Sequence, residues 1–194
     1  MAQLILASSS PYRRQLLERL NVPFEQYSPA IDETLIQSSQ LPVQQKAEQL
    51  AVLKAEAVLA KFSKAIVIGG DQIAALGEEV LLKPGSAENA VAQLRLLSGR
   101  THCLYTAIAI MSSDRRDVFT DIARLSMRPH TEAELQAYVA VDQPYDCAGS
   151  YKFEENGHRL FTSVQCEDKT AIQGIPLTRL VAFLAAYKCG GVPL

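Results

Sequence analysis

Apolar runs typical of buried strands alternate along this chain with segments that have helical periodicity. The strand-like runs cover residues 3–8, 65–70, 101–112 and 117–127, and the helical patterns cover residues 11–20, 42–62, 86–99, 132–140 and 175–188. Residues 71–84 have the pattern of a hairpin or β-arm that turns at Gly77. Interleaving of this kind is typical of α/β proteins, in which helices cover a sheet. The sequence therefore predicts an α/β fold.

The size and charge of the chain narrow its class further. Its 194 residues are enough to bury a sizeable core, and we predict a single domain over residues 1–194. A net charge of -2 argues against binding to nucleic acid or to an anionic membrane. We find neither a signal-peptide pattern nor an apolar run of the ~20 residues that span a bilayer. The four cysteines are isolated, which favours reduced thiols, and we expect a cytoplasmic protein.

The stretch "LILASSSPYRRQLLERL" reads as a strand, a serine-rich turn and a helix. Pro11 suits the first helical position and Ser10 the N-cap. Arg13 and Arg14 lie in the first turn, where the helix dipole opposes positive charge. A strand-to-helix turn is an anion site, and two guanidinium groups there become useful if they bind a phosphate chain. The alternative is that they pair with surface carboxylates such as Glu18.

Two more charged residues lie at unusual positions. Lys54 lies where the helical pattern predicts an apolar residue, and Asp71 lies where the pattern predicts the end of a strand. Lys54 lies on the apolar face of the predicted helix at residues 42–62, so it either extends its stem to solvent or serves a site. Asp71 follows the apolar run at residues 65–70, at the expected carboxyl end of a central strand, where α/β proteins bind ligands. A carboxylate there suits a metal ligand or a general base, and a turn-forming aspartate is the alternative.

An acidic pair, Asp32 and Glu33, and the isolated Lys83 complete this set of charged residues. Carboxylates that hold a divalent cation, several basic side chains and a serine turn are what hydrolysis of a phosphoanhydride requires. Hard oxygen ligands suit Mg²⁺ or Mn²⁺. The residues together therefore indicate metal-dependent phosphoanhydride chemistry.

Seven motifs in order, from "LILASSSPYRRQLL" and "IDET" through "LAVLKAEAV", "VIGGDQ", "LLKP" and "LRLLSGRTH" to "CAGSYKFEENG", resemble those of the Maf family of nucleoside triphosphate pyrophosphatases. The resemblance implies hydrolysis between the α and β phosphates of a nucleotide, with a divalent metal. It also implies an elongated mixed β-sheet flanked by helices, two lobes with a cleft between them, and a homodimer.

The resemblance also implies roles for individual residues. Asp71 corresponds to the catalytic proton acceptor and, with Glu33, to the metal-binding carboxylates. The phosphate-binding set corresponds to Ser8, Arg13, Arg14, Lys54 and Lys83. The family's last-loop aspartate corresponds to Asp168, although "CEDKTAIQGIPL" departs from the more usual Asp-Pro-Asn pattern there.

Three positions bear on the substrate that the resemblance implies. Family members that act on dTTP or UTP carry arginine, threonine and glutamine where this chain has Tyr12, Gln72 and Glu154, and members that act on 7-methyl-GTP resemble this chain. A cationic methylated guanine suits the Glu154 carboxylate and the Tyr12 ring. The alternative is that Tyr12 packs against Leu16 and that Glu154 is a solvated acid.

Three other functions compete with this one. The protein could act on dTTP, UTP or other modified nucleotides, or it could be a non-catalytic nucleotide-binding regulator of cell division. A cysteine hydrolase built on Cys147 is the third, but no nucleophile motif surrounds that residue. Because Asp71 and Glu33 are both present, we prefer the enzyme.

Overall fold

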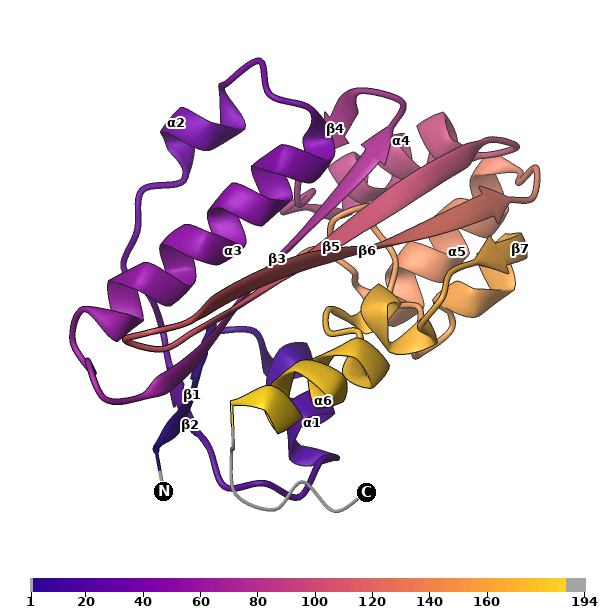
Figure 1. Ribbon diagram of the computed structural model, residues 1–194. Helices are drawn as coiled ribbons and strands as arrows, with labels where there is room; N and C mark the ends of the chain where they lie inside the picture. Colours follow the sequence, from indigo (N-terminus) through magenta and orange to yellow (C-terminus); the bar gives the residue numbers. More distant parts are fainter. Residues whose placement is uncertain (1, 188–194) are drawn as a thin grey trace. The chain divides into compact units, whose positions relative to one another are not determined.

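The computed structural model describes residues 2–187 and contains a seven-stranded sheet accompanied by helices (Figure 1). The strands are β1 (Leu4–Ala7), β2 (Glu25–Tyr27), β3 (Ile66–Leu76), β4 (Glu79–Leu81), β5 (Thr101–Met111), β6 (Arg116–Met127) and β7 (Phe161–Gln165). The α-helices are α1 (Pro11–Glu18), α2 (Thr34–Gln37), α3 (Val43–Leu59), α4 (Ala87–Leu97), α5 (Glu132–Asp142) and α6 (Leu177–Ala186). Two 3₁₀ turns are η1 (Gly157–Leu160) and η2 (Lys169–Gln173).

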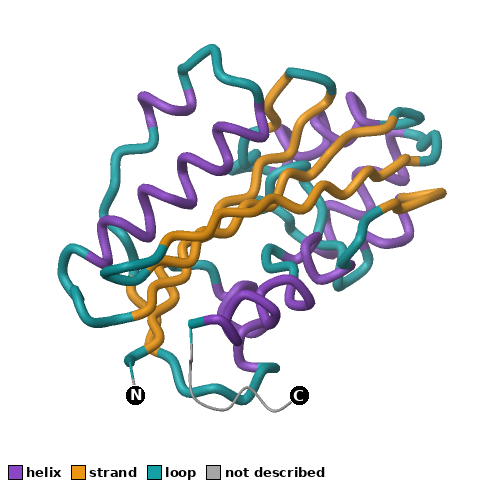
Figure 2. Tube along the Cα trace, viewed as in Figure 1, coloured by secondary structure: helices purple, strands orange, loops and turns teal. Residues whose placement is uncertain are grey.

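The sheet is mixed, as the resemblance implied. Its strand order is β2-β1-β3-β5-β6-β7, and β4 pairs with β3 off this path. Strand β1 is parallel to both β2 and β3, whereas β4 is antiparallel to β3 and β7 is antiparallel to β6. Figure 2 shows the strands in orange with helices in purple around them. The predicted α/β class is confirmed.

The chain divides into two compact units. Unit 1 takes the residues up to Asp71, then Thr106–Asp121 and the residues from Asp168 on; unit 2 takes Gln72–Tyr105 and Ile122–Glu167. The chain passes from one unit to the other within β3, β5 and β6. The single domain and the cleft expected from the sequence stay predictions.

In unit 1, helices cover both faces of the sheet (Figure 1). Helices α1 and α6 share one buried cluster with alternate residues of the strands, among them Leu4, Leu6, Ile66, Ile68, Ile108 and Ile110. Alternate strand residues share a face, so Ile5 and Val67 belong to the opposite face, which α3 covers. Continuous burial along β1 and the first half of β3 follows from this two-sided cover.

Two successive glycines in β3 let different neighbours approach its two faces. A Cβ on Gly69 would lie 2.2 Å from the backbone oxygen of Ala51, so α3 packs directly on the strand there. A Cβ on Gly70 would lie 3.2 Å from Nε of Arg13, on the α1 side. Side-chain direction alternates along the strand, and Asp71 therefore points, like Gly69, to the face that α3 covers.

In unit 2, α4 and α5 pack together and carry much of the buried surface. Their buried residues include Leu94, Leu97, Leu135 and Val139. Ser86 caps α4 by accepting a hydrogen bond from the backbone of Asn89, and Thr131 and Glu134 form a capping box at α5. Both helices therefore begin at residue types that N-cap positions favour.

One strand is longer than the sequence predicted. We expected β3 to end before Asp71, but it continues to Leu76 and then turns at Gly77 into β4, with φ of +62° at the glycine. The two glycines do not end the strand, because the absent side chains are replaced by contacts with α3 and Arg13. Asp71 therefore lies within β3 rather than after it.

Other differences concern short elements and the end of the chain. Strands β2 and β7 and helix α2 had no predicted counterpart, whereas α1, α3, α4, α5 and α6 lie where helices were predicted. Cys103, Cys147 and Cys166 are reduced thiols. Lys188, predicted as the end of the last helix, and Cys189 lie outside the described residues. No helix in residues 2–187 is long and apolar enough to cross a membrane.

The contact of Gly69 with α3 predicts a large stability difference between two glycine substitutions. Gly69→Ala should lower the free energy of unfolding by about 2 to 3 kcal/mol or more, because the new methyl group would collide with the α3 backbone at Ala51 and Ala55 and with Cβ of Ala55, none of which is a flexible group. Gly77→Ala meets nothing within 4 Å and should cost only about 1 kcal/mol through its positive φ. Urea denaturation measures both, and equal losses would show that α3 is not seated on Gly69.

Candidate functional site

The turn after β1 is built from backbone and hydroxyl groups. Ser10 is the N-cap of α1 and accepts a hydrogen bond from the backbone of Arg13, and Pro11 is the first helical residue, as predicted. Ser8 is buried, and its Oγ accepts a hydrogen bond from the backbone N–H of Ser10 at 3.2 Å. Gln26 of β2 donates from Nε2 to the carbonyl oxygens of Ser8 at 2.8 Å and Ser10 at 3.3 Å. The neighbouring strand therefore fixes the serine turn.

Arg13 lies in a narrow slot between two glycines. Its Nε donates to the carbonyl oxygen of Gly174 at 3.1 Å, and its Nη1 donates to Oγ of Ser8 at 3.3 Å. Cβ atoms on Gly70 and on Gly174 would both come within 3.2 Å of the Arg13 side chain. Gly174 has φ of +114°, a conformation that favours glycine. The slot thus holds the guanidinium group in one orientation.

The same slot leaves most of the Arg13 guanidinium group available to a ligand. A guanidinium group carries five N–H bonds, and within residues 2–187 two of them have protein acceptors. Burial lowers the pKa of Arg13, while the charges of Asp71 and Glu33 raise it, and an arginine stays protonated in either case. Arg13 is therefore a permanent cation that protein contacts orient, and three of its guanidinium N–H bonds have no acceptor within residues 2–187.

Lys54 links two of the predicted carboxylates. Its Nζ lies 2.6 Å from Oδ1 of Asp71 and 2.9 Å from Oε1 of Glu33. The side chains of Lys54 and Asp71 are only 13% and 11% exposed, so this pair is far less screened by water than a surface pair. The lysine on the apolar face of α3 thus reaches a site rather than solvent, and one of its three N–H bonds has no acceptor among the described residues.

The two neighbouring acids at the start of α2 have different partners. Hydrogen bonds from the side chain and the backbone N–H of Thr34 lower the pKa of Asp32. Glu33 contacts Lys54 through one oxygen and accepts a hydrogen bond from Gln37 through the other. Asp32 therefore orders the chain, and Glu33 is the acid that joins Lys54 and Asp71.

Arg14 and Tyr12 occupy other faces of α1. Arg14 is exposed and pairs with Glu18 at 2.9 Å, the alternative that the sequence left open. Exposed pairs of this kind contribute little to stability and exchange readily. Tyr12 is half-buried. Roles of Arg14 in phosphate binding and of Tyr12 in base recognition stay predictions.

Asp168 fixes the backbone between η2 and α6. Its Oδ1 accepts hydrogen bonds from the backbone N–H of Thr170 at 2.9 Å and from the Thr170 hydroxyl, and its Oδ2 accepts one from the backbone N–H of Thr178 at 2.7 Å. Burial raises the pKa of Asp168, but these hydrogen bonds outweigh it and hold the pKa below its ordinary value. Asp168 thus joins η2 to α6, around the segment that carries Gly174.

The remaining predicted residues, Gln72, Lys83 and Glu154, belong to unit 2. Gln72 is half-buried in β3, and Lys83 is exposed two residues after β4. Glu154 is exposed in the turn before η1, and partial desolvation and the adjacent Glu155 raise the pKa of Glu154. Glu155 pairs with Lys152 at 3.7 Å, whereas within the described chain the Glu154 carboxylate is bonded only to its own backbone N–H.

The donor set fits a magnesium-type cation in part. Residues 2–187 contain no cluster of three or more His, Cys, Asp or Glu side chains suited to hold a metal. Mg²⁺, however, is commonly held by one or two carboxylates together with substrate phosphates and water. Glu33 and Asp71 are two hard oxygen donors that already share one cation, the Lys54 ammonium group. A nucleotide-dependent cation therefore fits these residues, but a protein-only metal cage does not.

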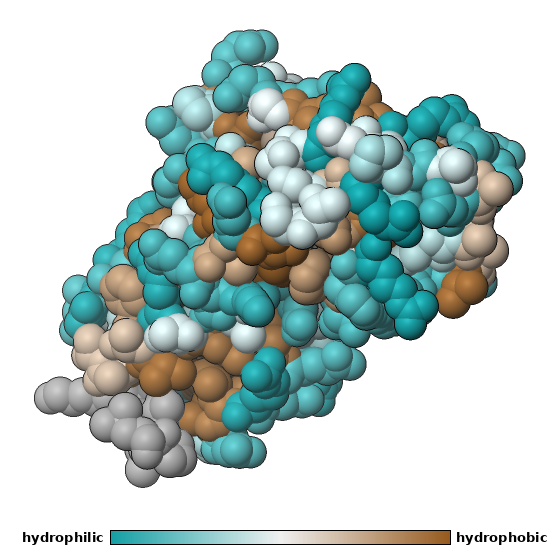
Figure 3. Space-filling model, turned by 90° about the vertical axis from the view of Figure 1, so that its right-hand side faces the viewer, coloured by the Kyte–Doolittle hydropathy of each residue, from teal (hydrophilic) through white to brown (hydrophobic). Residues whose placement is uncertain are grey.

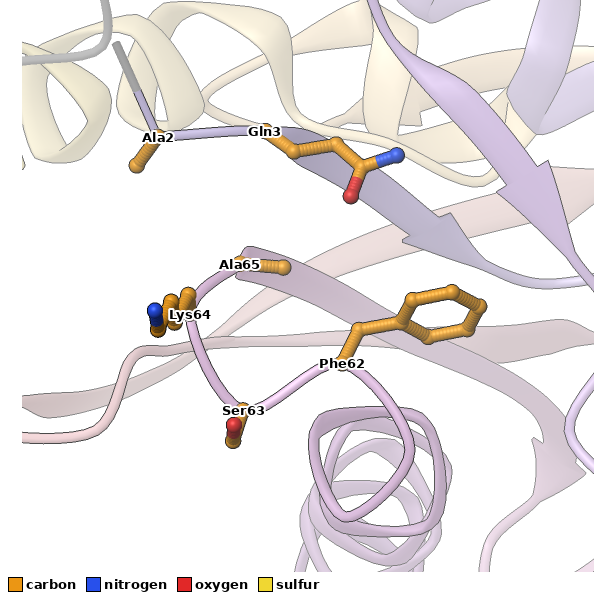
Figure 4. A pocket seen from close by; sticks show the side chains of 6 residues that line it. All are labelled: Ala2, Gln3, Phe62, Ser63, Lys64 and Ala65. Atoms are coloured by element: carbon orange, nitrogen blue, oxygen red, sulfur yellow. The ribbon is translucent and has the colours of Figure 1, made fainter.

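Two surface hollows lie among residues 2–187, and neither is lined by Arg13, Lys54, Asp71 or Glu33. One lies at the start of β1 and β3 and is lined by Ala2, Gln3, Phe62, Ser63, Lys64 and Ala65 (Figure 4). The other is lined by Arg14, Glu18, Val22, Pro23, Phe24, Glu25 and Gln26. On the face in Figure 3, apolar residues form small groups separated by polar ones. Neither hollow has largely buried charged side chains that are held by hydrogen bonds, whereas Arg13, Lys54 and Asp71 are such side chains.

Sequence reasoning missed two residues that orient this cluster. Gln26 lies in a three-residue strand with too few positions to show a period. Gly174 contributes a backbone carbonyl, which no side-chain pattern reports, across 161 positions of sequence from Arg13. The only available signal was the turn composition of "QGIPL".

Comparisons with known proteins agree with the fold and define the family. The structure of a HAM1 protein from Coxiella burnetii is similar, with a TM-score of 0.52 and 14% identity over 96% of this chain and 100% of that chain. This likeness concerns the fold alone. The sequence matches the family described as "Maf-like protein" over residues 3–187. The chain therefore belongs to the Maf family.

Curated relatives extend over nearly the whole chain. A protein of Bdellovibrio bacteriovorus named 7-methyl-GTP pyrophosphatase is 43% identical over 92% of this chain and 93% of its own length. Proteins with the same name from Cupriavidus metallidurans and Pseudomonas aeruginosa are 43% and 41% identical, over 97% and 95% of this chain and 96% of each relative.

The contacts of Lys54 predict that its charge stabilises the fold. Lys54→Met should lower the free energy of unfolding by about 3 kcal/mol, because two carboxylates then face each other without their cation. Adding Asp71→Asn should recover part of this loss. Lys46→Met is the matched control on α3, since Lys46 donates only to the carbonyl of Gln37, and it should cost under about 1 kcal/mol. Equal losses at positions 46 and 54 in chemical denaturation would contradict the charge-pairing account.

Proposed function

We propose that the protein is a nucleoside triphosphate pyrophosphatase that hydrolyses 7-methyl-GTP to 7-methyl-GMP and pyrophosphate. The observation that carries the proposal is that Lys54 pairs with both Asp71 and Glu33, while the charges of these two carboxylates also act on the buried guanidinium group of Arg13. Relatives more than 40% identical over nearly the whole chain carry the name 7-methyl-GTP pyrophosphatase, which supports the same activity and substrate.

Phosphate binding is the first task of the cluster. Arg13 has three N–H bonds without acceptors in the described part of the protein, and Lys54 has one. A guanidinium group can hold two phosphate oxygens at once, and a lysine supplies a point charge. Ser8 at the serine turn, Arg14 and Lys83 complete the proposed phosphate-binding set. Within unit 1, Arg13 and Lys54 hold the triphosphate so that its α phosphorus faces Asp71.

Asp71 then acts on the attacking water. Its carboxylate accepts a proton as the water oxygen forms a bond to the α phosphorus, and the bond from that phosphorus to the bridging oxygen of the β phosphate breaks. Pyrophosphate leaves with the electrons of the broken bond. The ion pair with the Lys54 ammonium group orients the Asp71 carboxylate for this step.

A divalent cation, Mg²⁺ or Mn²⁺, is part of the proposal. The charges of Arg13 and Lys54 are balanced by those of Asp71 and Glu33, so a triphosphate adds negative charge that these four residues do not offset. Glu33 and Asp71 would hold the cation jointly with the phosphates. When bound, it supplies charge neutralisation and lowers the pKa of a coordinated water.

Base recognition is assigned to Glu154, Tyr12 and Gln72. Glu154 forms no salt bridge within the described residues, although the charge of Lys152 acts on it, whereas Glu155 is paired with Lys152 at 3.7 Å. A 7-methylated guanine carries a delocalised positive charge and N–H groups on its pairing edge, so the Glu154 carboxylate can both attract it and accept its hydrogen bonds. The Tyr12 ring adds about 0.5 to 2 kcal/mol for a cationic base. Cytoplasmic location, a homodimer and a single domain are further parts of this proposal, and none of them bears on the chemistry.

A substrate screen with product analysis tests the proposal. The protein with Mg²⁺ or Mn²⁺ should hydrolyse 7-methyl-GTP in preference to GTP, dTTP and UTP, and chromatography should find monophosphate and pyrophosphate as the first products. Equal or faster turnover of dTTP or UTP would overturn the substrate. Orthophosphate and a diphosphate as first products would overturn the mechanism, and nucleotide binding without pyrophosphate release would identify a sensor.

The role of Asp71 predicts a large loss of rate without loss of fold. Asp71→Asn changes little volume but removes the base, so kcat should fall by about 10² to 10⁴-fold. Asp32→Asn is the matched control, because Asp32 accepts its hydrogen bond from Thr34 and does not pair with Lys54. It should retain activity within about threefold. Near-normal turnover of the Asp71 variant at saturating metal would move the proton acceptor to Glu33.

The raised pKa of Glu154 predicts a pH-dependent selectivity. The ratio of kcat/KM for 7-methyl-GTP over GTP should fall from its value at neutral pH as the pH drops through the raised pKa and the carboxylate is neutralised. Glu154→Gln should lower the ratio at neutral pH by about tenfold and remove this acid-side fall. Glu155→Gln should leave the ratio at neutral pH unchanged and move the fall to lower pH, because the charge of Glu155 raises the pKa of Glu154. An unchanged ratio in the Glu154 variant would reject its role.

A further inference from the structure

The turn that carries Glu154 is attached to the end of α5 on both sides. Before it, the backbone N–H of Lys152 donates to the hydroxyl of Tyr138 at 2.9 Å. After it, Asn156 donates to Asp142 twice, from its backbone N–H at 3.1 Å and from Nδ2 at 2.7 Å. Tyr138 and Asp142 are four residues apart and therefore share one face of the helix.

The turn is also closed on itself. The backbone N–H of Gly157 donates to the carbonyl oxygen of Lys152 at 2.9 Å, which brings its two ends together. A Cβ on Gly157 would lie 2.4 Å from that oxygen, so only glycine allows this closure. Glu154 is thus exposed at the tip of a short segment whose ends are fixed by backbone hydrogen bonds.

Asp142 lies at a position where a negative charge is unfavourable. It is the last residue of α5, where the helix dipole opposes negative charge, and it is only 2% exposed. A buried carboxylate is costly unless hydrogen bonds compensate it, and the two bonds from Asn156 do so. The Tyr138 hydroxyl adds to this network, since burial and a hydrogen bond to Asp142 raise the pKa of Tyr138.

We propose that Asp142 and Asn156, with Tyr138 in support, are positioning residues that hold Glu154 where it recognises the methylated base. The inference rests on the proposed function. None of the three needs to contact the nucleotide; they fix the backbone on either side of Glu154. Because the free carboxylate is held in place, the base does not have to order the turn when it binds.

Reversing the Asp142–Asn156 pair tests this proposal. Asp142→Asn and Asn156→Ala should each lower the kcat/KM ratio of 7-methyl-GTP over GTP by about five- to tenfold, through a higher KM for 7-methyl-GTP with kcat within about twofold. The double variant Asp142→Asn with Asn156→Asp keeps a carboxylate, an amide and the net charge, and it should restore the ratio to within about threefold. Tyr138→Phe should shift the ratio in the same direction as the single variants.

Two controls separate positioning from other effects. Val141→Ala alters an exposed neighbour on α5 and should leave the ratio unchanged. Asn156→Ala keeps the charge of Asp142, so loss of selectivity only in Asp142→Asn would show a direct charge effect and overturn positioning. Single variants that fold and keep the ratio would also overturn it, as would a reversed pair that restores nothing. If Asp142→Asn does not fold, Asn156→Ala and Tyr138→Phe decide by the same criteria.

Hydrogen exchange gives a readout that does not depend on the proposed function. The backbone N–H groups of Lys152 and Asn156 should exchange slowly in the unaltered protein, at least tenfold faster in Asn156→Ala, and slowly again in the reversed pair. If the unaltered protein shows no preference for 7-methyl-GTP, the proposed function fails. The exchange pattern then still shows whether the Asp142–Asn156 hydrogen bonds fix the turn that carries Glu154. If the preference holds but exchange does not change, the positioning proposal fails by itself.

Discussion

The ammonium group of Lys54, held between Asp71 and Glu33, is the interaction on which the rest of unit 1 depends. Three elements distant in sequence, α3, β3 and the start of α2, meet at this one nitrogen. Two carboxylates near a buried face would repel each other without it, and an unpaired lysine there would lose its hydration. The cluster therefore connects the packing of the sheet with the charge needed to handle phosphate.

Glycine positions in the structure serve the same cluster. Gly69 allows α3 to approach β3 closely enough for Lys54 to reach Asp71, and Gly70 and Gly174 leave the slot that Arg13 fills. The arginine in the first turn of α1, unfavourable for the helix dipole by itself, is compensated by the Gly174 carbonyl and by the field of Asp71 and Glu33. In this way backbone packing, rather than further side chains, orients the two cations.

Sequence patterns predicted the parts of the fold that local rules determine. The five helices of eight or more residues, the N-cap Ser10 and the turn at Gly77 all follow from periodicity, capping and turn preferences. Lys54 and Asp71 were detectable because each broke a pattern. The three-residue strand β2 could not be predicted, since its formation depends on pairing with β1. The Gly174 carbonyl and the pairing of Glu155 with Lys152 likewise depend on tertiary contacts, which the sequence does not reveal.

The central claim is that Arg13 and Lys54 bind the triphosphate beside Asp71. A crystal structure of the Asp71→Asn variant with 7-methyl-GTP and Mg²⁺ tests it most directly, because the substitution slows turnover and keeps the bound nucleotide intact. The account predicts phosphate oxygens within hydrogen-bonding distance of the Arg13 guanidinium group and of Nζ of Lys54, with the α phosphorus facing position 71. A triphosphate bound elsewhere, for example at the hollow lined by Phe62, Ser63 and Lys64, would contradict it.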